Sequence, residues 1–178
     1  NSNSEYEKDD FSQSLFQIQN KFTPNNQIML HSSIYTTLAS GWWDFDLPNF
    51  LGSDNSSSIE DISRNTINSQ LIGLYSNFSY KSKRLTSITG FHGNTYKNKF
   101  EESHMCSEEI WNKNTKNKSE ISVFQKLEYK LNNFLIMGDI QFRHSLFNYT
   151  SSLYFEPISW SFMNPKIGLS YNVSNNII

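Results

Sequence analysis

Two tryptophans and two carboxylates fall within five consecutive positions, residues 42–46, which read WWDFD. Indole rings offer flat apolar faces to a ligand, and carboxylates attract cations. Residues 27–39, just before this cluster, have a strand-like pattern, so the cluster is expected where a loop begins. Ligand contacts are predicted for Trp42, Trp43, Asp44 and Asp46. The alternative is that the two indoles lie at a lipid-water boundary, where such rings are enriched.

A second group of candidate side chains lies between residues 104 and 111. Its His104 and Trp111 are also predicted to contact a ligand. The residues between them include further types that can bind metal ions, namely Met105, Cys106, Glu108 and Glu109. No pair among them has the recurrent spacing of a structural zinc site, so no metal site is predicted.

No arrangement of residues points to catalysis or to a bound cofactor. The sequence has no nucleophile elbow and no Gly-rich phosphate loop, and its 4 His residues have no Ser or Cys partner at a suggestive position. A net charge of −2 gives no strong electrostatic case for nucleic acid. The single cysteine, Cys106, excludes an internal disulfide framework. An enzyme is therefore not expected.

Alternating hydrophobicity predicts the elements that position these side chains. Residues two apart share a face of a β-strand, so alternation gives one apolar and one polar face. Within residues 27–39, Ile28, Leu30 and Ile34 share one parity, and polar residues such as His31 have the other. The segments with this pattern are 11–22, 27–39, 69–80, 85–96, 119–130, 134–147 and 166–173. The expected fold is all-β, an antiparallel up-and-down meander of about seven long strands.

These strands are long enough to cross a membrane. A tilted transmembrane strand needs roughly 9–11 residues, whereas an ordinary strand has roughly 5–6. The mean hydropathy of −0.58 does not argue against a membrane, because a barrel strand shows lipid only alternate side chains. No stretch approaches the ~20 apolar residues of a membrane helix. The meander is therefore predicted to be part of a transmembrane β-barrel.

The connections are expected to alternate between short and long, as in outer-membrane barrels. Short turns are predicted at 23–26, 81–84 and 131–133, and long external loops at 40–65, 97–118 and 148–165. The aromatic residues beside the short turns are Phe22, Tyr80, Tyr129 and Phe134. All four have the parity of the apolar face, which predicts an aromatic girdle at the lipid boundary.

Charged side chains have the opposite parity and are predicted to face the lumen. They are Lys21, Glu120, Lys126, Glu128, Asp139 and Arg143. Such charges can line a substrate path or contact a plug. The simpler interpretation is ion pairing across strands in a wet interior, because a polar lumen is usual for such walls.

Two runs of sequence resemble a known family. Residues 136–143, IMGDIQFR, and residues 162–171, FMNPKIGLSY, are similar to consecutive barrel strands of TonB-dependent outer-membrane receptors of the Bacteroidetes type. In that family an Asn-Pro-Lys/Arg-x-Gly-Leu/Ala-x-Tyr strand follows a Gly-Asp-Leu-Gln-Tyr-Arg-like strand. Gly41, Trp42 and Trp43 stand where the family has a Gly-Tyr-Tyr-like entry to a loop.

The resemblance implies an importer in the cell outer membrane of a Gram-negative bacterium. Such receptors capture a scarce ligand, such as a ferric siderophore or another metal chelate, at external loops. The TonB complex supplies energy through a plug domain inside a barrel of about 22 strands. No plug or coupling segment is recognisable, so residues 1–178 are expected to be one part of a barrel domain. The expected partners are outer-membrane lipid, the plug and the rest of the barrel, the TonB complex and a small-molecule chelate.

Three alternatives stay open. A passive outer-membrane porin or channel would use the same wall. A soluble extracellular β-sandwich for adhesion predicts strands of roughly six residues and two sheets that cover one core. A barrel-embedded hydrolase needs a Ser and a His brought together at the lumen.

Overall fold

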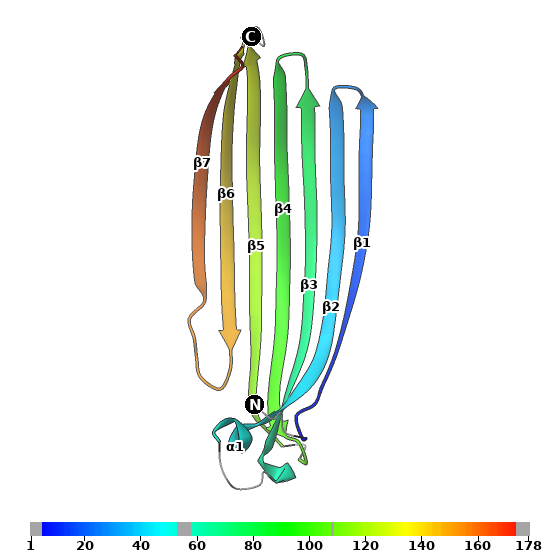
Figure 1. Cartoon of the computed structure of the whole chain (residues 1–178), viewed down its shortest axis with the longest axis vertical. Helices are drawn as coiled ribbons and strands as arrows, with labels where there is room; N and C mark the ends of the chain where they lie inside the picture. The colour runs from blue at the N-terminus through cyan, green and yellow to red at the C-terminus, as the bar shows by residue number, and fades with distance from the viewer. Residues whose placement is uncertain (1–4, 53–57, 108, 174–178) are drawn as a thin grey trace.

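The computed structural model describes residues 5–52, 58–107 and 109–173, and this part of the chain forms one antiparallel sheet (Figure 1). The strands lie side by side in chain order. They are β1 (Asp9–Asn25), β2 (Ile28–Asp46), β3 (Ile62–Lys81), β4 (Leu85–His104), β5 (Ile110–Leu131), β6 (Phe134–Thr150) and β7 (Ile158–Tyr171). The connection from β2 to β3 contains two short helices, α1 (Leu47–Phe50) and η1 (Ile59–Asp61). The predicted all-β meander is confirmed.

One face of the sheet carries apolar side chains on most of its strands, and it is called the apolar face. The register sets Ile18 opposite Ile34 and Ile34 opposite Leu74, and farther along it sets Val123 opposite Phe142. Residues that are paired across neighbouring strands project from the same side of the sheet, so the apolar positions of successive strands lie on one surface. These side chains are exposed, Ile18 by 78% of its surface. The apolar positions in adjacent strands thus meet on one face, as the alternation predicted.

No second layer of protein covers the apolar face within the described part of the chain. Ile62 is the one buried apolar residue there, and all seven strands belong to the same sheet. A β-sandwich needs a second sheet packed on the first. The sandwich alternative is therefore wrong, and the uncovered apolar face fits a wall that meets lipid. None of the described helices is long and apolar enough to cross a membrane.

The four aromatic residues predicted beside the short turns share the apolar face. Tyr129 lies opposite Ile136, and Phe134 lies opposite Tyr171. The rings of Phe134 and Tyr171 have their centroids 4.8 Å apart, so Tyr171 extends the aromatic row to β7. Amphipathic rings at this depth suit the headgroup layer of a bilayer.

The second and third short turns lie where the sequence predicts them, whereas β1 continues through residues 23–25, which were predicted to belong to the first turn. The three turns occupy residues 26–27, 82–84 and 132–133. In the first, the side-chain oxygen of Asn25 accepts hydrogen bonds from the backbone N–H groups of Gln27 and Ile28, each at 2.9 Å. In the last, Asn132 adopts the left-handed region with φ of 51°, which Asn tolerates better than most residues.

The opposite face, the polar face, is less exposed. Over residues 67–79 of β3 and 88–98 of β4, its residues are all buried or half-buried. Most apolar-face residues in the same stretches are exposed. This difference indicates that the sheet curls toward its polar face, as the wall of a barrel does.

Aromatic rings cover glycines on the polar face. Tyr35 lies directly opposite Gly73, and Phe124 lies directly opposite Gly90. A Cβ atom added at either glycine would overlap the ring that faces it. Glycine weakens a strand, but a ring from the neighbouring strand shields the bare backbone and restores packing.

A Gly90→Ala substitution should therefore destabilise the sheet, because Phe124 must leave its place over β4. The expected loss is about 1–3 kcal/mol of unfolding free energy, the usual cost of overpacking. Gly138→Ala is the matched control, since a Cβ there meets nothing within 4 Å. It should be neutral or slightly stabilising. Denaturant titrations in detergent measure both, and equal stability of the two variants would contradict the steric argument.

The strands continue well past their predicted ends. The loops expected at 40–65, 97–118 and 148–165 are wrong over much of their length, because the connections are 47–61, 105–109 and 151–157. In this half of the sheet both faces carry polar residues, as in the run Lys97, Asn98 and Lys99. Alternation disappears where both faces meet water, although the hydrogen-bonded ladder continues. The contrast between short and long connections is accordingly smaller than predicted.

Candidate functional site

The ends of β2 to β5 opposite the tight turns form a rim that carries the predicted ligand-binding residues. Trp42, Trp43, Asp44 and Asp46 lie in β2, and His104 lies in β4 and Trp111 in β5. Their predicted placement in external loops is wrong, because the strands extend to the rim. Strand pairing therefore decides which of these side chains meet.

Asp44 and Trp42 are joined by Arg64, which lies opposite Asp44 in β3. The guanidinium donates from Nε and Nη2 to the two carboxylate oxygens of Asp44, at 2.8 and 2.9 Å. It also lies over the Trp42 ring, with Cζ 4.0 Å from the ring centroid. The Asp44 side chain has no exposed surface. This carboxylate therefore anchors β2 to β3, and Arg64 already occupies it.

Asp46 shapes the connection that follows β2. Its Oδ1 accepts a hydrogen bond from the backbone N–H of Asn49 at 3.0 Å and so caps the N-terminus of α1. Its own backbone N–H donates to the carboxylate of Glu7 at 3.3 Å. Asp46 is almost fully buried. Asp46 therefore fixes the position of α1 at the start of the connection from β2 to β3.

His104 and Trp111 meet across the connection from β4 to β5. Their rings are edge-to-face with centroids 4.2 Å apart. A register shift between Glu102 and Ser103 in this strand pair accompanies the contact. Both rings are exposed, so they remain accessible to a ligand.

Beside this ring pair is a hollow whose lining includes metal-binding residue types. The lining residues are Asp61, His104, Cys106, Ser107 and Glu109, and Glu108 lies outside the described residues. No three His, Cys, Asp or Glu side chains of the described chain are arranged to hold a metal ion. The carboxylate of Asp61 accepts hydrogen bonds from the backbone N–H and hydroxyl of Ser58, each at 2.9 Å. These bonds lower the pKa of Asp61.

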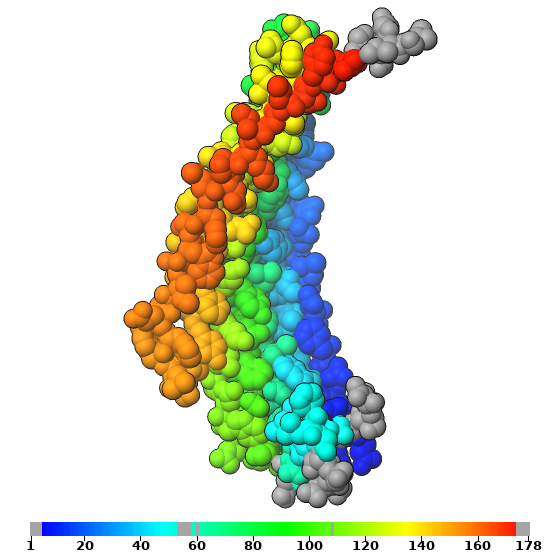
Figure 2. Space-filling view, turned by 60° about the vertical axis from the view of Figure 1, so that its left-hand side comes forward, coloured from blue at the N-terminus to red at the C-terminus, as the bar shows by residue number. Residues whose placement is uncertain are grey.

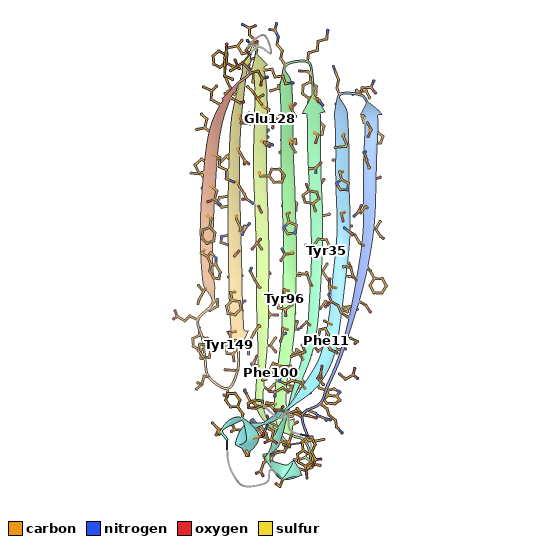
Figure 3. The ribbon with its side chains drawn as sticks, in the orientation of Figure 1. Phe11, Tyr35, Tyr96, Phe100, Glu128 and Tyr149 are labelled. Carbon is orange, nitrogen blue, oxygen red and sulfur yellow. The ribbon has the colours of Figure 1, made fainter. Side chains whose placement is uncertain are left out.

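Trp43 belongs to the polar face and lies apart from the Trp42 cluster. Its ring centroid is 6.1 Å from that of Phe100. On the side of Trp43 toward the tight turns is a hollow of about 340 Å³, lined by Phe11, Gln13, Thr37, Ala39, Ile67, Ser69, Leu71, Tyr96 and Asn98. Asn98 donates to the hydroxyl of Ser69 at 2.8 Å and to that of Tyr96 at 3.1 Å. Figure 3 shows Phe11, Tyr96 and Phe100 at this level of the sheet. The hollow combines aromatic and hydrogen-bonding groups.

Tyrosine and histidine side chains continue along the polar face toward the turns. The hydroxyl of Tyr35 lies 2.7 Å from Nε2 of His92, and the two rings stack with centroids 6.2 Å apart. His31 and Tyr75 form an edge-to-face pair at 6.0 Å. These contacts cross from β2 to β4 and from β2 to β3 and so stiffen the wall.

The predicted lumen-facing charges share the polar face, and several are paired. Nζ of Lys126 lies 3.0 Å from the carboxylate of Glu128. Glu120 lies 3.7 Å from Arg143 and 3.5 Å from Lys118. Asp139 lies in register with Lys126 on one side and Lys166 on the other. Four of these charges, Glu120, Lys126, Glu128 and Arg143, thus lie in ion pairs, of which only the Glu120–Arg143 pair crosses strands.

A Ser–His pair is present, but on the other face. Nδ1 of His144 lies 2.9 Å from Oγ of Ser161. The register places both residues on the apolar face, opposite Ile121. Among the described residues, no carboxylate hydrogen-bonds to His144 to orient its ring, and the pair does not face the lumen. The geometry therefore gives no support to a barrel-embedded hydrolase.

The partner of Asp44 and the hollow lined by β1 to β4 could not be read from the sequence. Arg64 lies in a segment predicted to be a loop, and only the register of β2 with β3 brings it to Asp44. Phe11 in β1 and Tyr96 in β4 line the same hollow, with β2 and β3 between them. The parity of Tyr35 was readable from the sequence, but its contact with His92 also depends on register.

Comparison with known proteins defines the fold further. No protein-family model and no curated protein matches the chain. Among solved structures, the ferric citrate transporter FecA matches 96% of this chain with a TM-score of 0.70 at 11% identity. The copper transporter OprC matches 96% with a TM-score of 0.72 at 8% identity. The ferric preacinetobactin receptor BauA from Acinetobacter baumannii matches 94% with a TM-score of 0.65 at 7% identity.

These matches cover only part of each transporter. The share is 26% of FecA and 29% of OprC and of BauA. At such low identity the likeness concerns the fold alone. The chain thus has the fold of a section of the barrel wall of transporters and uptake receptors.

Proposed function

We propose that this chain is part of the β-barrel domain of a TonB-dependent receptor, of the Bacteroidetes type, in the outer membrane of a Gram-negative bacterium. The receptor imports a scarce ligand such as a ferric siderophore or another metal chelate. One observation carries the proposal: a single sheet with strands of 14–22 residues leaves its apolar face uncovered. Transporters for iron chelates and copper have similar sheets.

The two edges of the sheet support a larger barrel. β1 and β7, of 17 and 14 residues, each pair on one side only within the described chain. Each unpaired backbone group in hydrocarbon costs several kcal/mol, so an open edge is not stable there. β1 and β7 would therefore each pair with a further strand of the barrel. The polar face would line the barrel interior around a plug domain.

The predicted site residues at the rim fall into two groups, those whose rings are exposed and those that are engaged in contacts within the sheet. Trp43, His104 and Trp111 present exposed rings that can contact a chelate. Trp42, Asp44 and Asp46 are engaged with Arg64 or α1 and would hold those rings in place. On the polar face, Lys126, Glu128, Asp139 and Arg143 would line the route past the plug.

Uptake of labelled iron tests the proposal. Deleting the gene under iron limitation should reduce uptake of ⁵⁵Fe supplied as ferric citrate or as a ferric catecholate, and the intact gene should restore it. Uptake should also be lost in cells without TonB, because the plug then receives no energy. Uptake of both chelates that is unchanged by gene deletion would contradict import. Gene-dependent uptake that survives without TonB would instead indicate a passive channel.

A further inference from the structure

Four cationic side chains gather at the end of the sheet that bears the short turns. Lys81 ends β3, Lys83 and Arg84 lie in the turn to β4, and Lys130 lies beside the end of β5. All four are exposed, and together they are called the basic patch. The backbone N–H of Lys130 donates to the carbonyl oxygen of Arg84 at 2.8 Å, which joins the two strand ends. Figure 2 shows the turn from β3 to β4, in green, beside the yellow turn from β5 to β6 at the top of the molecule.

No acidic side chain balances the basic patch within the described chain. The three short turns, and the two strand residues on either side of each, contain no Asp or Glu. Glu128, the acidic residue nearest to Lys130 in the sequence, lies 3.0 Å from Lys126. None of the ion pairs in the described chain includes a member of the patch. Acidic residues such as Glu101 and Glu102 lie near the rim, so the two ends of the wall differ in charge.

Hydrogen bonds fix the turn that carries Lys83 and Arg84. The backbone N–H of Ser82 donates to the carbonyl oxygen of Leu85 at 2.7 Å, and that of Leu85 donates to Oγ of Ser82 at 3.1 Å. The turn therefore holds its two cations close together, although like charges repel. An anion that binds between the cations relieves this repulsion, so the arrangement favours an anionic ligand.

The aromatic row places the basic patch at the level of lipid headgroups. Tyr80 directly precedes Lys81, and Tyr129 directly precedes Lys130. Such rings lie at the lipid-water boundary, so the cations that follow them lie at the depth of the phosphate groups. Lys and Arg reach these groups with long apolar stems. Clusters of about four to eight Lys and Arg residues just outside a membrane span attract anionic lipid.

Phosphate suits the basic patch better than the other anions that the wall can meet. A guanidinium binds two phosphate oxygens at once, and an ammonium adds a point charge. In the proposed import, a chelate meets the rim, at the opposite end of the strands. An acidic protein needs a surface to dock on, and the turns at this end have only two or three residues each. Lipid headgroups, by contrast, surround the end of any wall that crosses a bilayer.

We propose that the basic patch binds the phosphate groups of anionic phospholipids in the leaflet on the turn side of the membrane. Arg84 binds two oxygens of one phosphate, and Lys81, Lys83 and Lys130 supply further positive charge. The bound lipid fixes how deep this end of the wall lies in the leaflet. The inference rests on the proposed function, because it needs the wall to cross a bilayer.

Native mass spectrometry of the full-length receptor tests this proposal. The receptor in a neutral detergent is titrated with phosphatidylglycerol, which is anionic, and separately with phosphatidylethanolamine, which is zwitterionic. We expect phosphatidylglycerol to bind more tightly. Lys83→Gln combined with Arg84→Gln should weaken its binding by about 5- to 30-fold, because each lost cation removes attraction to the headgroup.

A second pair of substitutions is the matched control. Lys99→Gln combined with Lys116→Gln also removes two exposed cations, but from the half of the sheet near the rim. This variant should bind phosphatidylglycerol as tightly as the wild-type receptor does. All four substituted residues are exposed, so their loss should not unfold the wall, and gel mobility before and after heating checks the fold.

Equal affinities for the two lipids would overturn the proposal, and so would an unchanged affinity for phosphatidylglycerol after substitution of both Lys83 and Arg84. Binding of an acidic peptide such as polyglutamate in place of phosphatidylglycerol would also overturn it and would indicate a protein partner. Insertion into liposomes is measured in parallel. A receptor that fails to insert contradicts the membrane proposal itself. One that inserts and imports iron without a preference for phosphatidylglycerol contradicts this inference alone.

Discussion

An Ile18→Arg receptor should lose about 2–4 kcal/mol of unfolding free energy in a lipid bilayer, the cost of Arg on the lipid face near mid-membrane. Ile18 lies in a row with Ile34 and Leu74 on the apolar face, and it is 78% exposed. In the proposed membrane, this exposed surface meets hydrocarbon. Denaturant titration of the receptor in liposomes, followed by tryptophan fluorescence, measures the change.

The neighbouring residue supplies the control. Gln19 lies in the same strand, is also exposed, and has the opposite parity, so its side chain belongs to the polar face. Gln19→Arg should change stability by less than about 1 kcal/mol, because a wet interior solvates the added charge. If the two variants are equally stable, the apolar face does not meet lipid, and the proposed membrane function fails with it.

Removing the guanidinium at the rim should have an effect of similar size. Arg64→Ala leaves the buried carboxylate of Asp44 without its two hydrogen bonds and removes the cation over Trp42. Loss of one partner from a buried ion pair costs about 3–5 kcal/mol. Arg64 is 31% exposed, so we expect a value near the lower end, about 3 kcal/mol. The measurement is again the free energy of unfolding.

An exposed ion pair in the same half of the sheet is the comparison. Lys113 and Glu101 lie 2.6 Å apart, with 63% and 33% of their side chains exposed. Lys113→Ala should cost less than about 1 kcal/mol, because water replaces the lost partner. Arg64→Lys should recover only part of the loss, since an ammonium cannot bind both carboxylate oxygens as a guanidinium does. A loss for Lys113→Ala as large as that for Arg64→Ala would show that burial of Asp44 does not set the energy.

The half of the sheet near the tight turns was predictable from the sequence. Between the aromatic row and the middle of the strands, one face is apolar and the other polar. Period-two alternation there predicts both that a segment is a strand and which face each side chain belongs to. The parity of Phe22 and Tyr129 in the sequence placed both on the apolar face, and the register confirms it. Asn residues marked two of the three short turns: Asn132 adopts the left-handed region, and the side chain of Asn25 accepts two backbone hydrogen bonds.

The other half was not predictable by the same reasoning. From Lys97 to His104 and from Ile110 to Lys118, polar residues occupy both faces, so the pattern resembles a loop while the backbone remains paired. Pairing across strands also decides the contacts at the rim. Nothing in the order of residues along the chain sets Asp44 opposite Arg64, which lie 20 positions apart.

The extension of the ladder to the rim has a consequence for how a binding surface can diversify. Side chains there project from a hydrogen-bonded ladder, so exchange of an exposed residue such as Trp43 would change the surface and leave the strand pairing intact. Insertion of a single residue into β4 beyond Lys97 would instead send every following side chain to the reverse surface. New specificity in this wall should therefore arise chiefly through substitutions and through changes confined to residues 47–61, 105–109 and 151–157.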